Sequence, residues 1–194
     1  MMTTRKDIIR YAYGARPIDS YLRKLNNSSE RYYHFLHHLS RNLNGLFVVL
    51  GVNEAVCCAH ICSANDDVYV VGVDYNRTDL ADDVADKFGN FTYVIDISLG
   101  SIALQVIDKF VNDIGKISAV LFDTTHTYDQ VIGEYYHLKK YLLNGAVLIF
   151  DDVHAAEDDV LRAVNEIPGE YIPLDYLHRS LGFGVKLYDT SVTI

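Results

Sequence analysis

Short runs of apolar residues recur along the chain from residue 46 onward, each about as long as one buried β-strand. The runs that predict strands of a parallel sheet are 46–50, 68–73, 91–95, 117–122 and 146–150. Two further extended runs, 171–174 and 183–188, have no helical pattern between them. They predict an antiparallel hairpin at one edge of the sheet.

Helical patterns separate the apolar runs, and three of them place apolar residues on a single stripe: 99–111, 128–142 and about 156–167. Thr127 and Gln130 are spaced as a capping box at the start of the second helix, and Gly145 is a typical stop signal after it. Buried strands that alternate with helices require right-handed crossovers. The pattern therefore predicts an α/β fold, a doubly wound and mostly parallel Rossmann-like sheet with a C-terminal antiparallel hairpin.

The 194 residues suit one main domain, and we expect a helical arm or lid over 1–44 followed by the Rossmann-like domain over 45–194. The net charge is −9, yet residues 1–45 contain eight Lys or Arg and three Asp or Glu. The rest of the chain, the acidic body of the protein, therefore carries the negative charge. This argues against nucleic acid as a partner, because duplex binding depends on clustered cations. The basic arm is either a set of solvated helix faces or a lid over the cleft.

No apolar run approaches the roughly 18 residues that a membrane span needs, so we expect a cytoplasmic protein without a membrane partner. Cys57, Cys58 and Cys62 lie within six residues and are expected to pack inside a helix rather than to form disulfides. His34, His37 and His38 fall within about one helical turn and are expected on an exposed helix face.

The turn after the first strand is a weakened glycine-rich loop. Gly51 allows a tight turn, Asn53 tolerates a left-handed backbone, and Ala55 is small enough for close helix packing. Asp74 follows Gly51 by 23 residues, near the spacing at which an acid binds ribose hydroxyls. These residues predict a nucleoside-bearing cofactor, with an ordinary strand-to-helix turn as the alternative.

Carboxylates follow the fourth and fifth predicted strands, at Asp123, Asp151 and Asp152. The carboxyl ends of adjacent parallel strands meet at one edge of the sheet, and three carboxylates there repel one another unless a cation such as Mg²⁺ neutralises them. The alternative is that they cap a helix or hold a loop amide. His126 and His154 lie close in sequence to these acids and could accept a proton, or could serve local structure only.

Two segments, Val120–Asp129 (VLFDTTHTYD) and Asn144–Asp152 (NGAVLIFDD), resemble the small metal-dependent branch of class I S-adenosylmethionine-dependent methyltransferases. That branch includes sugar O-methyltransferases of antibiotic biosynthesis and, more distantly, catechol O-methyltransferase. The resemblance implies that Asp123, Asp151 and Asp152 hold Mg²⁺. It also implies contacts with S-adenosylmethionine at Gly51, Asn53, Ala55, Asp74, Asp96 and Ile97.

The resemblance implies an enzyme, an S-adenosylmethionine-dependent O-methyltransferase that acts with Mg²⁺ on a hydroxyl of a small molecule such as a sugar or phenol. Asp123 and either His126 or His154 are then the candidate catalytic residues. Asn53, Ala55 and Thr125 stand where relatives usually carry glycines or an acid. A catalytically weakened methyltransferase-like binding or partner domain is therefore one alternative, and an NAD-dependent Rossmann enzyme is another. The 15 tyrosines are compatible with contacts in a homodimer.

Overall fold

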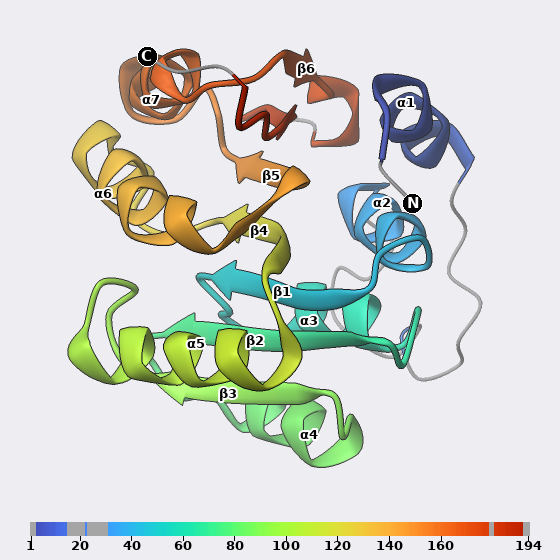
Figure 1. The fold of residues 1–194 in the computed structure, drawn as a ribbon, viewed down its shortest axis with the longest axis vertical. Coiled ribbons are helices and arrows are strands. Elements are labelled where there is room, and N and C mark those ends of the chain that lie inside the picture. Colours follow the sequence, from blue (N-terminus) through green and yellow to red (C-terminus); the bar gives the residue numbers. More distant parts are fainter. Residues whose placement is uncertain (1–2, 15–21, 23–30, 179–180, 192–194) are drawn as a thin grey trace.

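Seven β-strands form one sheet in the order β3-β2-β1-β4-β5-β7-β6, which runs from bottom to top in Figure 1. The computed structural model describes residues 3–14, 22, 31–178 and 181–191. Strands β1 to β5 pair in parallel, whereas β7 pairs antiparallel with both β5 and β6. The strands are β1 (Gly45–Leu50), β2 (Val68–Asp74), β3 (Phe91–Ile95), β4 (Ile117–Phe122), β5 (Leu142–Asp151), β6 (Tyr171–Pro173) and β7 (Phe183–Leu187). The predicted α/β fold and its C-terminal hairpin are confirmed.

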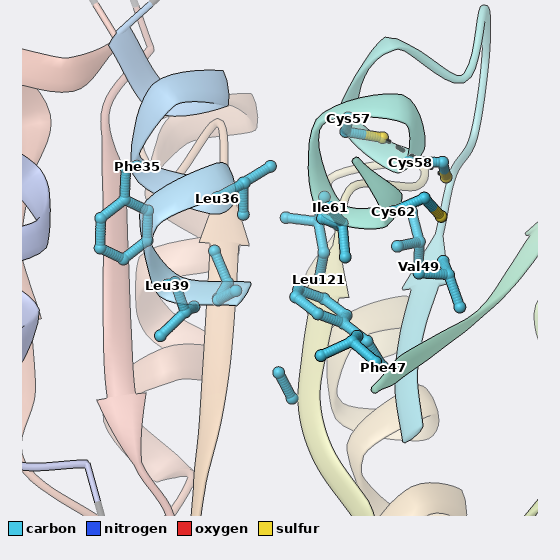
Figure 2. Close-up of a cluster of buried hydrophobic side chains, with 14 of the residues drawn as sticks. Phe35, Leu36, Leu39, Phe47, Val49, Cys57, Cys58, Ile61, Cys62 and Leu121 are labelled. Carbon is cyan, nitrogen blue, oxygen red and sulfur yellow. Dashed lines mark hydrogen bonds between the residues drawn. The ribbon is translucent and has the colours of Figure 1, made fainter. Parts of the chain in front are cut away.

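Helices cover both faces of the sheet. They are α1 (Arg5–Gly14), α2 (Arg31–Ser40), α3 (Val56–Cys62), α4 (Asp79–Lys87), α5 (Ser101–Ile114), α6 (Tyr128–Leu138) and α7 (Asp159–Glu166), with short 3₁₀ turns η2 (Lys139–Tyr141), η3 (Ala156–Asp158) and η4 (Asp175–Leu177). Side chains of a strand alternate between faces, so in β1 Phe47 and Val49 join the apolar cluster under α1 to α4. Leu46 and Val48 join the cluster under α5 to α7. Figure 2 shows side chains of α2 and α3 beside Phe47, Val49 and Leu121.

The N-terminal helices belong to this packing. Ile8 of α1 and Phe35 of α2 are fully buried in the same apolar cluster as one face of the sheet. Burying such a side chain stabilises the fold by roughly 1.5–3 kcal/mol. Among the described residues, no helix has the length and apolar character that crossing a bilayer demands.

The predicted helix over 128–142 is too long. Helix α6 ends at Leu138, η2 follows, and β5 begins at Leu142, before the apolar run that predicted this strand. Leu142 pairs with Ile117 of β4 and is 3% exposed, so sheet pairing determines its conformation more than its place on the helical stripe. Gly145 lies within β5 at φ 81° and does not stop a helix.

The predicted exposed histidine face on α2 is also wrong, because α2 packs against both α1 and α3. His37 is buried and its Nδ1 lies 3.0 Å from the carbonyl oxygen of His60 in α3. The cysteines behave as expected, since the free thiols of Cys57, Cys58 and Cys62 are all buried in α3.

Candidate functional site

The turns that follow β1, β4 and β5 surround a cavity of about 380 Å³ at the carboxyl end of the sheet. This is the edge at which open α/β sheets bind their ligands. The structure brings the three predicted metal-binding carboxylates, Asp123, Asp151 and Asp152, to its wall. The other lining residues are Tyr32, Tyr33, Val52, Asn53, Glu54, Val56, Cys57, His178 and Leu181.

The turn after β1, residues 51–55, is called the glycine turn here and packs directly on the loop that carries Asp123. Gly51 has φ 89°, and a Cβ at this position would lie 1.7 Å from the carbonyl oxygen of Asp123. Asn53 and Ala55 both adopt left-handed backbone conformations, with φ of 49° and 57°. The sequence predicted this conformation for Asn53 but only small size for Ala55. Glycine at position 51 therefore lets this turn approach the Asp123 loop more closely than any side chain would permit.

Asp74 holds the glycine turn in place from the end of β2. Its Oδ2 accepts hydrogen bonds from the backbone amides of Val52 and Asn53 at 2.9 and 2.8 Å. Its Oδ1 accepts one from the amide of Asn76 at 2.9 Å. A carboxylate offers about four lone-pair positions, so Asp74 retains capacity for a ribose hydroxyl.

Asp96 caps the N-terminus of α5. Its Oδ2 accepts hydrogen bonds from the amides of Ile102 and Ala103, both at 3.0 Å, and its Oδ1 accepts one from the amide of Ile97 at 2.9 Å. The residue Ile97 is 62% exposed. The structure thus places Ile97 at the surface of the turn after β3 and uses Asp96 to fix that turn.

His126 lies between two of the carboxylates. Its Nε2 is 3.2 Å from Asp123 Oδ1 and 3.7 Å from Asp152 Oδ2. The hydrogen bond with Asp123 raises the pKa of His126, and this effect exceeds the opposing effect of burial. His126 and Asp152 also have φ of 54° and 49°, left-handed values that are uncommon outside glycine and concentrate at functional sites.

Asp151 is the most buried of the three carboxylates. Its residue is 6% exposed, and within the described part of the chain its carboxylate accepts one hydrogen bond, from the Asp152 amide at 3.0 Å. Burial, followed by the charges of Asp123 and Asp152, raises the pKa of Asp151 well above its usual range. A bound divalent cation would supply the missing neutralisation, so these oxygen donors fit a metal ion.

His154 is engaged by acids outside the lining of the cavity. Its Nδ1 lies 2.9 Å from Asp158 Oδ1 and its Nε2 lies 3.5 Å from Asp175 Oδ1, and it is not among the lining residues. His178, which the sequence did not indicate, lines the cavity instead, with its Nδ1 3.6 Å from Asp152 Oδ1. No spacing in the sequence marks His178, because the C-terminal hairpin folds back to bring it there.

Glu134 of α6 is a second polar residue that the sequence did not indicate. It is fully buried, and its Oε1 accepts hydrogen bonds from Ser98, Gln130 and Thr124 at 2.5, 2.7 and 2.9 Å. The Gln130 side chain donates hydrogen bonds to Ser98 and Glu134 and does not form the predicted capping box. The Thr127 side chain makes no capping hydrogen bond. Glu134 therefore connects the turn after β3 with the loop after β4.

Comparisons with known proteins found a matching family model and similar solved structures. A family model described as a methyltransferase domain matches residues 48–153. The O-methyltransferase TomG from Streptomyces achromogenes, solved in complex with S-adenosylmethionine, has 15% identity and a TM-score of 0.69, over 97% of this chain and 100% of that one. CalS11, a TDP-rhamnose 3'-O-methyltransferase of calicheamicin biosynthesis, has 11% identity and a TM-score of 0.64, over 97% of both chains. The S-adenosylhomocysteine-bound methyltransferase PaMTH1 from Podospora anserina has 9% identity and a TM-score of 0.63, over 97% of this chain and 98% of that one.

The comparison with curated protein sequences gave no match. The solved structures, all at low identity, establish the fold. The family match covers more than half of the chain and includes the glycine turn, Asp74, Asp96, Asp123 and the Asp151–Asp152 pair. The chain therefore belongs to the methyltransferase-domain family and is a class I S-adenosylmethionine-dependent methyltransferase.

Proposed function

We propose that the protein transfers the methyl group of S-adenosylmethionine to a hydroxyl oxygen of a small molecule, with a divalent cation such as Mg²⁺ held by Asp123, Asp151 and Asp152. The observation that carries this proposal is the buried Asp151 carboxylate, which faces a cavity beside two further carboxylates. Three such groups gain most from a shared cation. Two structural neighbours, TomG and CalS11, are named as O-methyltransferases, which is consistent with this choice of acceptor atom.

The glycine turn is the proposed binding site for the amino-acid end of the cofactor, with contacts at Gly51, Asn53 and Ala55. The Asp74 carboxylate would accept a hydrogen bond from the ribose in addition to those it accepts from the turn. The adenine would then lie against the turn of Asp96 and Ile97, where the exposed Ile97 side chain offers an apolar surface.

S-adenosylmethionine supplies a methyl group that is already activated by its positive sulfur, so the protein mainly has to orient the acceptor and remove its proton. A bound divalent cation would lower the pKa of the acceptor hydroxyl. His126 is not among the residues that line the cavity, but Asp123 holds its Nε2, so neutral His126 would take the proton of an acceptor that reaches its Nδ1. Tyr32 and Tyr33 of α2 would form the wall that excludes water from the acceptor.

The lining of the cavity favours a small neutral acceptor, such as a sugar or a phenol. Four of its described residues are acidic, and none of the described lining residues is Lys or Arg. Apart from the proposed metal ion, an anionic acceptor would find no cationic partner among these lining residues. The acidic body of the protein likewise disfavours a nucleic-acid acceptor.

The direct test follows transfer of a radiolabelled methyl group from S-adenosylmethionine to a panel of sugars and phenols, with Mg²⁺ or with a chelator. We expect transfer that the chelator abolishes and that Asp151→Asn reduces at least about a hundredfold, as a metal ligand should. Asp86→Asn, at an exposed position of α4, is the matched control and should retain full activity. Transfer that persists both with the chelator and in Asp151→Asn would contradict the metal role.

A further inference from the structure

An imidazole lies beside the two acids that follow β5. Asp151, Asp152 and His178 each offer one ligand atom, and these three atoms lie within 4.8 Å of one another. A metal ion with bonds of about 2.1 Å holds neighbouring ligand atoms about 3.0–3.4 Å apart. A small adjustment of side chains would therefore bring all three atoms into a coordination sphere.

Asp123 has an imidazole partner of its own. Its Oδ1 is the hydrogen-bond acceptor of His126 Nε2 at 3.2 Å. His178 instead points a ring nitrogen at the acid pair, with Nδ1 3.6 Å from Asp152 Oδ1. The Tyr32 ring packs edge-on against the His178 ring, with the centroids 5.4 Å apart, and so limits where the imidazole can lie.

His178 Nδ1 carries a lone pair that only a weak hydrogen bond engages, and a metal ion would replace that bond. The backbone amide of Leu181 donates to this nitrogen at 3.4 Å, near the upper limit for a hydrogen bond. A lone pair that faces the Asp152 carboxylate is repelled by it unless a cation lies between them. The nine-tenths buried Asp151 carboxylate faces the same cavity, where the described lining includes no Lys or Arg to neutralise it.

We propose that His178 is a metal ligand together with Asp151 and Asp152, and that this nitrogen donor makes the site select a divalent transition-metal ion such as Mn²⁺ over Mg²⁺. The inference rests on the proposed metal-assisted function and refines its ion. Mg²⁺ prefers an environment of oxygen donors, whereas imidazole suits first-row transition metals. His178 then adds a nitrogen donor to the carboxylates that hold the ion, and Asp123 also holds His126.

The test is metal binding by the full chain after chelator treatment, followed through the electron paramagnetic resonance signal of free Mn²⁺ and through competition with Mg²⁺. We expect wild type to bind Mn²⁺ at least about tenfold more tightly than Mg²⁺. His178→Ala should lose at least about tenfold in Mn²⁺ affinity and change little in Mg²⁺ affinity. His137→Ala, at an exposed position of α6, should leave both affinities unchanged.

Pulsed electron paramagnetic resonance provides a readout independent of affinity. Bound Mn²⁺ should show modulation from a coordinated imidazole nitrogen in wild type and lose it in His178→Ala. Mn²⁺ that binds through Asp151 without this modulation, or with equal affinity in His178→Ala, would overturn the ligand assignment while leaving the metal-assisted function intact. A protein that binds S-adenosylhomocysteine but neither metal ion, measured by calorimetry on the same samples, would overturn both. Thermal unfolding of each variant establishes that it is folded.

Discussion

Ser98, in the turn that follows β3, donates a 2.5 Å hydrogen bond from its hydroxyl to the Glu134 carboxylate of α6. The same Glu134 oxygen accepts a hydrogen bond from Thr124, the residue next to Asp123. One buried oxygen thus joins the turn proposed to contact the adenine to the loop that carries Asp123 and His126. The positions of these two regions of the proposed active site therefore both depend on Glu134.

Replacing Glu134 by leucine should disturb both ends of this connection. The substitution leaves the Ser98 and Thr124 hydroxyls without their acceptor, so the free energy of unfolding should fall by about 2 kcal/mol and the affinity for S-adenosylhomocysteine should fall with it. Chemical denaturation and calorimetric titration measure the two effects. Glu134→Gln keeps one acceptor oxygen and should lose less of each. A leucine variant that matches wild type in both measurements would show that the connection has no energetic role.

Gly51→Ala should damage the cofactor site more than any other small change in the turn. The new Cβ would lie 1.7 Å from the Asp123 carbonyl oxygen, at a backbone φ of 89° that alanine adopts poorly. We expect a lower melting temperature and at least about tenfold weaker S-adenosylhomocysteine binding, which corresponds to about 1.4 kcal/mol. Gly89→Ala is the control, because a Cβ there meets no atom within 4 Å. Unchanged binding in Gly51→Ala would mean that the cofactor does not use this turn.

His60 should make the protein sensitive to mild acid. Both of its ring nitrogens are buried without a hydrogen-bond partner among the described residues, and burial, with the nearby His37 and His34, lowers its pKa from 6.5 to about 3. Below pH 6.5 His60 binds a proton in the unfolded chain, whereas in the folded protein it stays neutral until the pH approaches 3. Stability is therefore lost as the pH falls from 6.5 towards 3, and this group has no such effect above that range.

His60→Leu removes this titration. The slope of the unfolding free energy against pH, measured by chemical denaturation between about pH 4 and 6, should decrease by up to about 1.4 kcal/mol per pH unit. His37 has a pKa lowered mainly by burial, so part of the slope should remain. His137→Leu, at an exposed position, should leave the slope as in wild type. An unchanged slope in His60→Leu would show that His60 is not buried in its neutral form.

The sheet was predictable because strands buried on both faces are continuous apolar runs, as in 46–50 and 117–122. The placement of Asp123 and Asp151 at one cavity followed from topology, since parallel strands end at the same edge. The boundary between α6 and β5 was not predictable, because the pairing of Leu142 with Ile117 depends on a contact distant in sequence.

The site residues that the sequence did not predict were missed for the same reason, because their contacts are distant in sequence. His178 and Tyr32 reach the cavity from opposite ends of the chain, and no local spacing connects either of them with Asp152. Gln130 matched a helix cap by spacing, yet it turns to the buried Glu134, whose burial no sequence pattern shows. Long-range packing decides where these polar side chains lie, and sequence periodicity reports only the apolar faces.

The most direct test of the proposed metal and cofactor sites is a crystal structure of the protein with S-adenosylhomocysteine and Mn²⁺. Anomalous diffraction data would locate the metal. We predict a manganese peak within about 2.5 Å of the Asp151 and Asp152 carboxylates, in the same cavity as a cofactor molecule bound at the Gly51 turn. S-adenosylhomocysteine bound elsewhere, or a cofactor-filled site without manganese between these carboxylates, would contradict it.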